Sequence, residues 1–271
     1  EIDRLVQLTE PELEEFKAAR KPVYAHWLSV LKFAYCNQRS NEEMAIHLLK
    51  RGQPDLTGIF LIANDPISHT FWHFYQPQEY GGKVEPAMAR RLGQTVPNIY
   101  RHNDGYLARL RQVIGPETVV MVVSDHGFQA SGIVPKPADL NGRAGWLESW
   151  YQRRKNVGID PDNVAVGQSG KHHLDGVFIA SGGPVRKGVE LSEPPRIYDI
   201  APTILALLGL PVPEDMEGRV LEEIIEPAFL EKHPIRRIAS YEEFIDREVL
   251  ASTASGDDST IDMLRALGYI E

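Results

Sequence analysis

The pattern of hydrophobic and polar positions alternates between helical and strand-like spacing. Residues 9–50 and 96–115 have helical spacing, and the first of these segments opens with Thr9 and Glu12 placed as a capping box. Three mostly apolar runs predict buried strands, over residues 55–65, 118–123 and 176–183. This alternation predicts a layered α/β fold in which helices flank a largely parallel sheet.

The later part of the chain divides into a helical signal and a weaker tail. The stretch "DIAPTILALLGLP" predicts a helix with Asp199 as its N-cap and a stop at Gly209. Beyond residue 226 the periodicity weakens. We therefore predict an α/β domain over residues 1–226, with an insert near the candidate site at 129–168, and an acidic tail with short helices over 227–271.

Charge and hydropathy narrow the classes of function. The formal net charge of −9 comes from the acidic surplus after residue 210, and no dense cluster of Lys and Arg predicts a nucleic-acid surface. No apolar run is long enough to predict a membrane-spanning segment. These features indicate a globular protein with a sizeable core, and they do not indicate a compartment.

The candidate chemistry lies at the ends of the predicted strands. Asp65 and His69 follow the first strand and Asp125 and His126 follow the second, while the adjacent pair His172 and His173 precedes the third. Functional groups gather where the strands of a parallel sheet end, so we expect these side chains to meet. Each one alone is ordinary, because an Asp after a strand is often a helix cap and a His is often a core residue. Their coincidence at three strand-adjacent positions favours a site.

Carboxylate oxygen and imidazole nitrogen together predict a metal centre. The single cysteine excludes a Cys-rich zinc site, and the remaining ligand types suit Zn²⁺, with Mn²⁺ or Fe²⁺ as alternatives. Asp65 and His69 are one helical turn apart and can face one ion. Asp125 and His126 are adjacent, so they can point the same way only if a turn follows Ser124. Spacing alone does not choose between the two adjacent histidines at 172 and 173.

His73 invites a different interpretation, because it makes an H-x-x-x-H pair with His69. A zinc protease of that pattern needs Glu directly after the first His as its general base, and Thr70 stands there instead. We therefore predict that His73 supports the site from behind or packs in the core.

Four stretches in this order carry a resemblance to a known family: "NDPISHTFW", "VVMVVSDHGF", "SGKHHLDGVFIASGGPVRKG" and "IYDIAPTILALLGLPVPEDMEGRVL". Over about residues 45–222 the chain resembles the carboxyl-terminal half of the alkaline phosphatase superfamily. The branch it resembles most is the type I phosphodiesterase/nucleotide pyrophosphatase branch. The resemblance implies an alkaline-phosphatase-like fold and a metal-dependent phosphoester hydrolase acting on a phosphoester or nucleotide-like substrate.

The resemblance also implies roles for the candidate residues. Two divalent ions, usually zinc, would be held by Asp65, His69 and His172 for one and by Asp125 and His126 for the other. His172 is preferred to His173 because the family's Gly-x-His pattern matches Gly170, Lys171 and His172. The ions would activate a nucleophilic hydroxyl and stabilise charge on the phosphate, and the reaction would pass through a covalent phospho-enzyme.

The chain departs from the family pattern at its start. Family members place an early strand ending in a further metal-binding Asp, followed by a Thr or Ser nucleophile, and neither is recognisable before residue 45. We therefore expect a missing N-terminal half of the same protein to supply them, and this chain alone can lack activity. The alternatives are a sulfatase, a phosphonate hydrolase or a phosphoglycerate-mutase-like enzyme of the same superfamily, or a non-catalytic metal-binding module.

Overall fold

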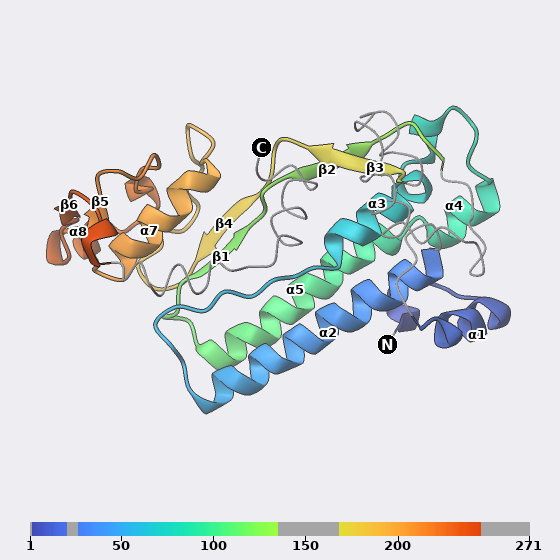
Figure 1. The fold of residues 1–271 in the computed structure, drawn as a ribbon, viewed down its shortest axis with the longest axis horizontal. Coiled ribbons are helices and arrows are strands. Elements are labelled where there is room, and N and C mark those ends of the chain that lie inside the picture. The colour runs from blue at the N-terminus through green and yellow to red at the C-terminus, as the bar shows by residue number, and fades with distance from the viewer. Residues whose placement is uncertain (1, 21–26, 135–167, 245–271) are drawn as a thin grey trace. The chain divides into compact units, whose positions relative to one another are not determined.

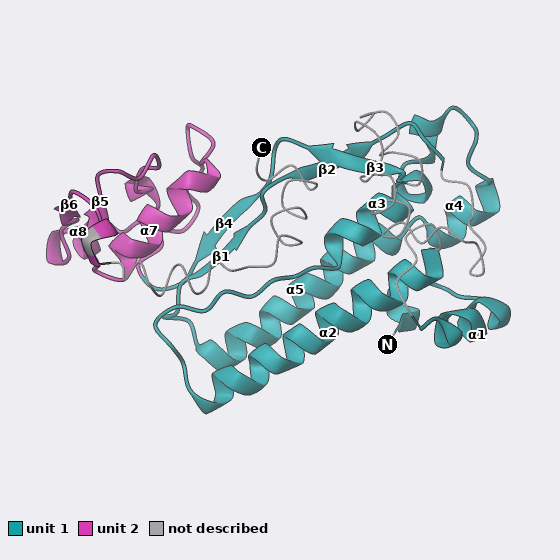
Figure 2. Cartoon of the chain, viewed as in Figure 1, with its two compact units in different colours: residues 1–183 teal, residues 184–271 magenta. Residues whose placement is uncertain are grey.

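The structure, a computed structural model, describes residues 2–20, 27–134 and 168–244 (Figure 1). The chain forms two compact units, residues 1–183 and 184–271 (Figure 2). Most of the predicted insert at 129–168 and the tail beyond residue 244 lie outside the described residues. The domain boundary predicted at residue 226 stays a prediction.

The first unit is built on packed helices whose bounds are α1 Glu10–Ala18, α2 Trp27–Arg51, α3 Asn64–Tyr75, α4 Pro86–Leu92 and α5 Thr95–Ile114. Helices α2, α3 and α5 lie against one another. Their shared core contains Leu31 from α2, Ile67 and Phe71 from α3, and Ile99 from α5, all without solvent exposure. The helical spacing of apolar residues in the sequence therefore corresponds to this core. The predicted capping box at Thr9 and Glu12 is confirmed at the start of α1.

An antiparallel ribbon of four short strands crosses the first unit (Figure 1), with bounds β1 Val120–Val123, β2 Gly127–Ala130, β3 Gly170–His173 and β4 Phe178–Ser181. Strand β1 pairs with β4, and β2 pairs with β3, in both cases antiparallel. This differs from the largely parallel sheet that we predicted. The reason is that the chain leaves β2 and returns along the same ribbon as β3, so neighbouring strands run in opposite directions.

The ribbon is bulged where its two halves meet. Three residues separate β1 from β2, whereas four separate β3 from β4. Ser124 holds the two sides together, since its N–H donates to Val177 O at 3.0 Å and its hydroxyl accepts from Val177 N–H at 2.9 Å. A Cβ on Gly176 would lie 2.3 Å from Ser124 O, so this crossing requires glycine. The bulge bends the ribbon at Asp125 and His126.

The strand predicted at residues 55–65 is wrong. Residues 55–61 have no regular secondary structure, and residues 64 and 65 begin α3. Ile59 and Leu61 pack against the core side chains of α2 and α5, while Leu56 is 59% exposed and Phe60 is 71% exposed. The apolar run that predicted a buried strand is therefore only partly buried, and no strand of the described chain pairs with this segment.

The second unit is small and contains α7 (Ile200–Leu207), α8 (Pro227–Lys232) and two short parallel strands, β5 (Val212–Pro213) and β6 (Arg237–Ile238). Asp199 occupies the predicted N-cap position of α7. Its carboxylate, however, accepts the backbone N–H groups of Arg196 at 2.8 Å and Arg219 at 2.9 Å. Asp199 therefore ties two loops to the helix start.

Short 3₁₀ helices complete the described secondary structure, at Ile2–Arg4, Pro77–Tyr80, Ile197–Asp199, Glu222–Ile224 and Glu242–Phe244. A search of the described residues found no helix with the length and apolar character needed to cross a membrane.

Candidate metal centre

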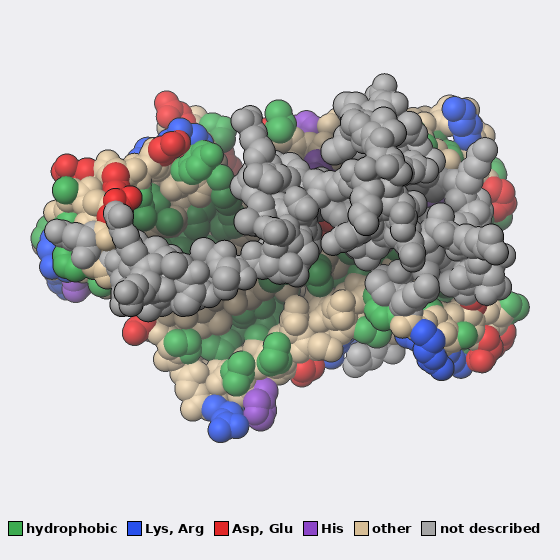
Figure 3. Space-filling model, viewed as in Figure 1, with side chains coloured by type: hydrophobic (Ala, Val, Ile, Leu, Met, Phe, Trp, Pro, Cys, Tyr) green, Lys and Arg blue, Asp and Glu red, His purple; other side chains and the backbone are tan. Residues whose placement is uncertain are grey.

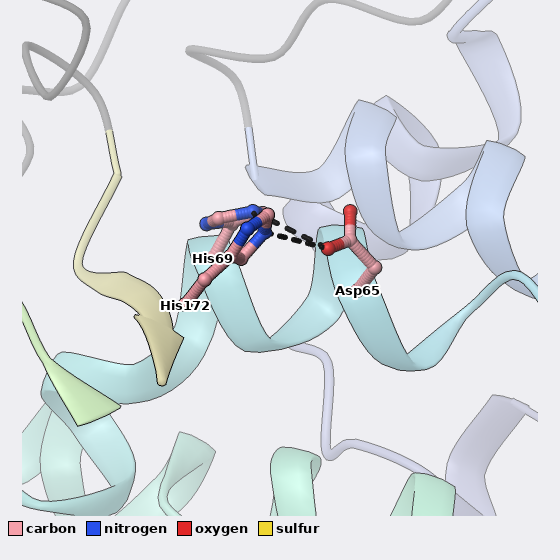
Figure 4. Close-up of side chains that lie close together, drawn as sticks. All are labelled: Asp65, His69 and His172. Carbon is pink, nitrogen blue, oxygen red and sulfur yellow. Dashed lines mark hydrogen bonds and ion pairs between the residues drawn. The ribbon is translucent and has the colours of Figure 1, made fainter. Parts of the chain in front are cut away.

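Asp65, His69 and His172 bring their ligand atoms together at the start of α3 (Figure 4). Asp65 and His69 project from consecutive turns of α3, and His172 projects from β3 toward them. Nε2 of His172 lies 3.2 Å from Asp65 Oδ1 and 3.0 Å from His69 Nε2, and His69 Nε2 lies 3.4 Å from the same Oδ1. One oxygen and two imidazole nitrogens thus converge from segments far apart in the sequence.

Backbone contacts between α3 and β3 set this convergence. The carbonyl of His69 accepts the N–H of Ser169 at 2.7 Å, and Nδ1 of His69 lies 2.8 Å from Gly170 O. Because a carbonyl only accepts, Nδ1 of His69 carries the proton and its Nε2 presents a lone pair to the cluster. This contact fixes the ring as outer partners of metal-bound histidines do.

Gly170 allows the strand to approach the helix closely. A Cβ at this position would lie 2.5 Å from the backbone oxygen of Ser68 and 3.2 Å from Cβ of Trp72. Any larger residue would push β3 away from α3 and carry His172 with it. The glycine of the Gly-x-His pattern therefore has a steric reason in this fold.

His172 and His173 are neighbours in β3, and their side chains lie on opposite faces of the strand. Successive side chains of a strand point to opposite faces, so only one of two adjacent histidines can face α3. His172 does so, whereas Nδ1 of His173 lies 3.5 Å from Asp175 Oδ2 and accepts the Asp175 N–H at 3.2 Å. His173 therefore has its own partner on the other face of the ribbon.

The electrostatics around Asp65 favour the ionised carboxylate. Partial burial alone raises the pKa of this carboxyl, but its interactions with the imidazoles of His172 and His69 outweigh burial and hold the pKa well below its usual range. Asp65 also lies in the first turn of α3, where the helix dipole favours negative charge.

The donor set and its spacing fit a divalent ion such as zinc. Two ligand atoms about 2.05 Å from a tetrahedral ion lie about 3.3 Å apart, close to the three observed separations of 3.0, 3.2 and 3.4 Å. The side chains of Asp65 (49%) and His172 (44%) are about half exposed, so an ion held by them would be accessible to solvent. Three protein ligands with an open position are typical of catalytic rather than structural zinc.

Asp125 and His126 lie beside this triad. Nε2 of His126 is 3.7 Å from Asp125 Oδ1 and 3.8 Å from Asp65 Oδ1, and its ring stacks on His172 with centroids 3.6 Å apart. The bend after Ser124 therefore lets two adjacent side chains point the same way, as the sequence required. All five predicted site residues meet at one place, although the group with three close ligand atoms contains only Asp65, His69 and His172.

Phe128 contacts the imidazoles of the site, and the sequence did not predict this contact. Its ring makes edge contacts with those of His69, His126 and His172, with centroids 4.9–5.4 Å apart. It faces His172 directly across the ribbon, and Trp72 stacks on it. The only signal was its place two residues after His126, which does not distinguish a supporting ring from an ordinary strand residue.

His73 is buried and outside the ligand group. It is 7% exposed and contacts the rings of Phe74 and Tyr80. Burial lowers the pKa of its imidazole to about 4. This position agrees with a packing role, and His73 does not extend the group of Asp65 and His69.

Comparison with known proteins supports the same chemistry. The family model described as type I phosphodiesterase / nucleotide pyrophosphatase matches residues 12–178, more than half of the chain. The chain belongs to this family. As a member of the type I phosphodiesterase/nucleotide pyrophosphatase family, it is a hydrolase that acts on phosphoric ester bonds. No curated protein and no solved structure matched the chain.

The family match confirms the resemblance drawn from the motifs and covers a different range of the chain. The match begins at residue 12, whereas the resemblance began near residue 45, so the match includes α2 and most of α1. It ends at residue 178, ahead of α7 and the rest of the second unit. All five candidate ligands lie inside the matched range.

Proposed function

We propose that this chain carries the metal centre of a phosphodiesterase of the nucleotide pyrophosphatase type. The observation that carries the proposal is the convergence of Asp65, His69 and His172 in a member of a phosphoester-hydrolysing family. These residues are the proposed ligands of one divalent ion, with Zn²⁺ preferred and Mn²⁺ or Fe²⁺ as alternatives.

Asp125 and His126 are proposed ligands of a second ion. Support comes from their position beside the triad, with His126 between the carboxylates of Asp65 and Asp125. When bound, a pair of divalent ions supplies charge stabilisation for both the attacking and the leaving oxygen of a phosphoester. The role of the five side chains is to hold this charge where the phosphoester binds, and the role of Phe128 is to keep the imidazoles in place.

A cleft lined by Phe128, whose ring contacts the imidazoles, suits a substrate with an aromatic or sugar group. It has a volume of about 540 Å³ and is lined by Trp72, Tyr75, Tyr100, Arg101, Phe128 and His173, among others. Aromatic faces can stack on a planar group, and the Arg101 guanidinium can pair with a phosphate oxygen. These linings support a phosphoester or nucleotide-like substrate.

We further propose that hydrolysis passes through a phospho-enzyme whose Thr or Ser nucleophile comes from an N-terminal half of the same protein. Thr9 is unsuited to that role, because its hydroxyl is bound to the carboxylate of Glu12 in the capping box. Unpaired apolar surface supports the presence of another part. Leu56 and Phe60 are exposed in the segment predicted as a strand, and hydrophobic side chains lie open on the face near the end of α2 (Figure 3).

Hydrolysis of bis-p-nitrophenyl phosphate tests the proposed function. The longest natural form of the protein is compared with this chain, with and without a chelator, and p-nitrophenyl sulfate and a phosphonate monoester serve as competing substrates. We expect the long form to cleave the phosphodiester fastest and to lose that activity with the chelator. Preference for the sulfate or phosphonate, or no turnover by a metal-loaded long form, would contradict it.

A further inference from the structure

Helix α3, which carries Asp65 and His69, begins without a cap of its own. Its N-cap residue is Ala63, which has no side-chain acceptor for the free N–H groups of the first turn. The N–H of Ala63 instead donates to Gln38 Oε1, at 2.9 Å, from the neighbouring helix α2. Gln38 and Ala63 are both fully buried, so this bond is not exchanged with water.

The same glutamine leads to a second bond at the start of α3. Nε2 of Gln38 donates to Asn103 Oδ1 at 2.7 Å, and Nδ2 of Asn103 donates to Asn64 Oδ1 at 2.7 Å. Asn103 belongs to α5, so both neighbouring helices hold the two residues that precede Asp65. Gln38 lies 25 residues before Ala63 in the sequence, and Asn103 lies 39 residues after Asn64.

A buried carboxylate fixes the orientation of Gln38. Glu42 has no solvent exposure, and its oxygens accept from Gln38 Nε2 at 2.9 Å, Arg39 at 2.7 Å and His102 at 2.8 Å. Because an ionised carboxylate only accepts, the NH₂ group of Gln38 must face Glu42. Its Oε1 is then directed at the N–H of Ala63 and cannot exchange places with Nε2.

Glu42 is held in its charged form by the same contacts. Burial alone raises the pKa of its carboxyl, but hydrogen bonds from His102, Arg39 and Gln38 lower it below the ordinary value. A charged, fully buried residue with three donors is a specific arrangement, since charge is rarely buried without partners. Among the described residues, the side-chain hydrogen bonds of Gln38, Glu42 and Asn103 go to one another, to Arg39, His102, Ala63 and Asn64, and not to the three ligands.

We propose that Gln38, oriented by Glu42 and joined by Asn103, is a positioning residue that fixes the first turn of α3 so that Asp65 meets His172. The inference rests on the proposed metal function. The three ligand atoms are spaced by 3.0–3.4 Å, and His172 comes from a separate strand. A first turn that frays would move Asp65 relative to His172 and loosen the site, because ligands must be held within a few tenths of an ångström.

The experiment compares Gln38→Met with a matched core variant, Ile46→Ala, on the same helix. Ile46 is buried in a separate apolar cluster with Leu49, Tyr106 and Leu110, and its side chain takes no part in the hydrogen bonds of the network. Zn²⁺ affinity is measured by competition with a chromophoric chelator, and the visible absorption of the Co²⁺-loaded protein reports ligand geometry. We expect Gln38→Met to weaken Zn²⁺ binding about 10–100-fold, as loss of outer partners does, and to shift the Co²⁺ bands, while Ile46→Ala binds as the wild type does.

Asn64→Ala provides a milder second variant in case Gln38→Met does not fold. It removes the last bond of the network, together with the hydrogen bond of Asn64 to Tyr100, at a half-buried position, and we expect a smaller loss of affinity in the same direction. If the folded variants bind Zn²⁺ as the wild type does and their Co²⁺ spectrum is unchanged, the positioning role of Gln38 is overturned and the metal proposal stands. A wild-type protein that binds no ion would overturn the metal proposal as well, so the two failures are distinguishable.

Discussion

Nε2 of His172 lies 3.2 Å from Oδ1 of Asp65, although 107 residues separate them in the sequence. The contact exists because β3 is laid along α3 by the carbonyl of His69 and by the absence of a side chain at Gly170. Helix α3 therefore supplies Asp65 and His69, and strand β3 supplies His172, from opposite sides of the site. The proposed metal chemistry depends on this geometry more than on any single residue.

Replacing His172 and His173 separately tests which histidine binds metal. We expect His172→Ala to lower Zn²⁺ affinity by more than about 100-fold, beyond the loss usual for outer partners. His173→Ala is expected to change it by less than about threefold, because His173 faces Asp175. Isothermal titration of both variants measures the difference. Equal losses would contradict the assignment based on the faces of β3.

The second proposed ion has its own test in Asp125→Ala. Asp125 lies beside His126 and outside the close triad, so its removal is expected to lower the bound metal from two ions to one. Elemental analysis after extensive dialysis gives this ratio. A variant that still holds two ions would remove Asp125 from the proposed ligands.

A methyl group at Gly170 is expected to destabilise the protein. The added Cβ would meet Ser68 O at 2.5 Å, and relief of such overpacking costs about 1–3 kcal/mol of the free energy of unfolding. Urea denaturation measures the change, and Zn²⁺ titration of the folded variant is expected to show weaker binding because His172 moves.

Gly105→Ala is the control for Gly170→Ala. Gly105 lies inside α5 with nothing within 4 Å of an added Cβ, so the change is expected to stabilise by about 0.5–1 kcal/mol. The same sign of change in both glycine variants would contradict the close approach of β3 to α3.

Acid sensitivity is expected to come in part from His73. Burial lowers the pKa of this imidazole from 6.5 to about 4, so the unfolded chain takes up a proton at a higher pH than the folded chain does. The associated stability is fully present above pH 6.5 and is lost as the pH falls toward 4. Between pH 7 and pH 5 the loss is about 2 kcal/mol.

His73→Leu removes this titration and leaves the other groups in place. Urea denaturation of chelator-treated protein at both pH values is expected to show a loss smaller by about 2 kcal/mol in the variant. If both proteins lose the same stability, His73 is not the group that responds.

Hydrophobic spacing along the sequence predicted where helices form better than it predicted which segments pair or pack together. The spacing within α5 is set by its own buried residues, such as Ile99 and Tyr106, so the helix could be read directly. The pairing of β1 depends on a returning segment more than 50 residues later, which no local pattern specifies. Residues 55–61 show the limit most clearly, because their apolar run predicted a buried strand, whereas the segment has no regular secondary structure and pairs with no strand of the described residues.

The site shows the same division between local and distant information. Asp65 and His69 share a helix face, so their spacing predicted that they could act together. The choice between His172 and His173 needed the face of β3, and the family pattern only preferred one of them. Gln38 and Asn103 gave no signal at all, because a buried amide on a helix looks like an ordinary polar residue until its partners are placed.

The measurement that tests the central claim most directly is the Zn²⁺ content of the purified chain, compared with Asp65→Ala and with His73→Ala as a folded control. We expect at least one tightly bound ion per chain in the wild type and in His73→Ala, and its loss in Asp65→Ala, because Asp65 Oδ1 is shared by the contacts of three histidines. Metal-free wild-type protein, or equal metal in all three proteins, would contradict the assignment of this cluster as a metal centre.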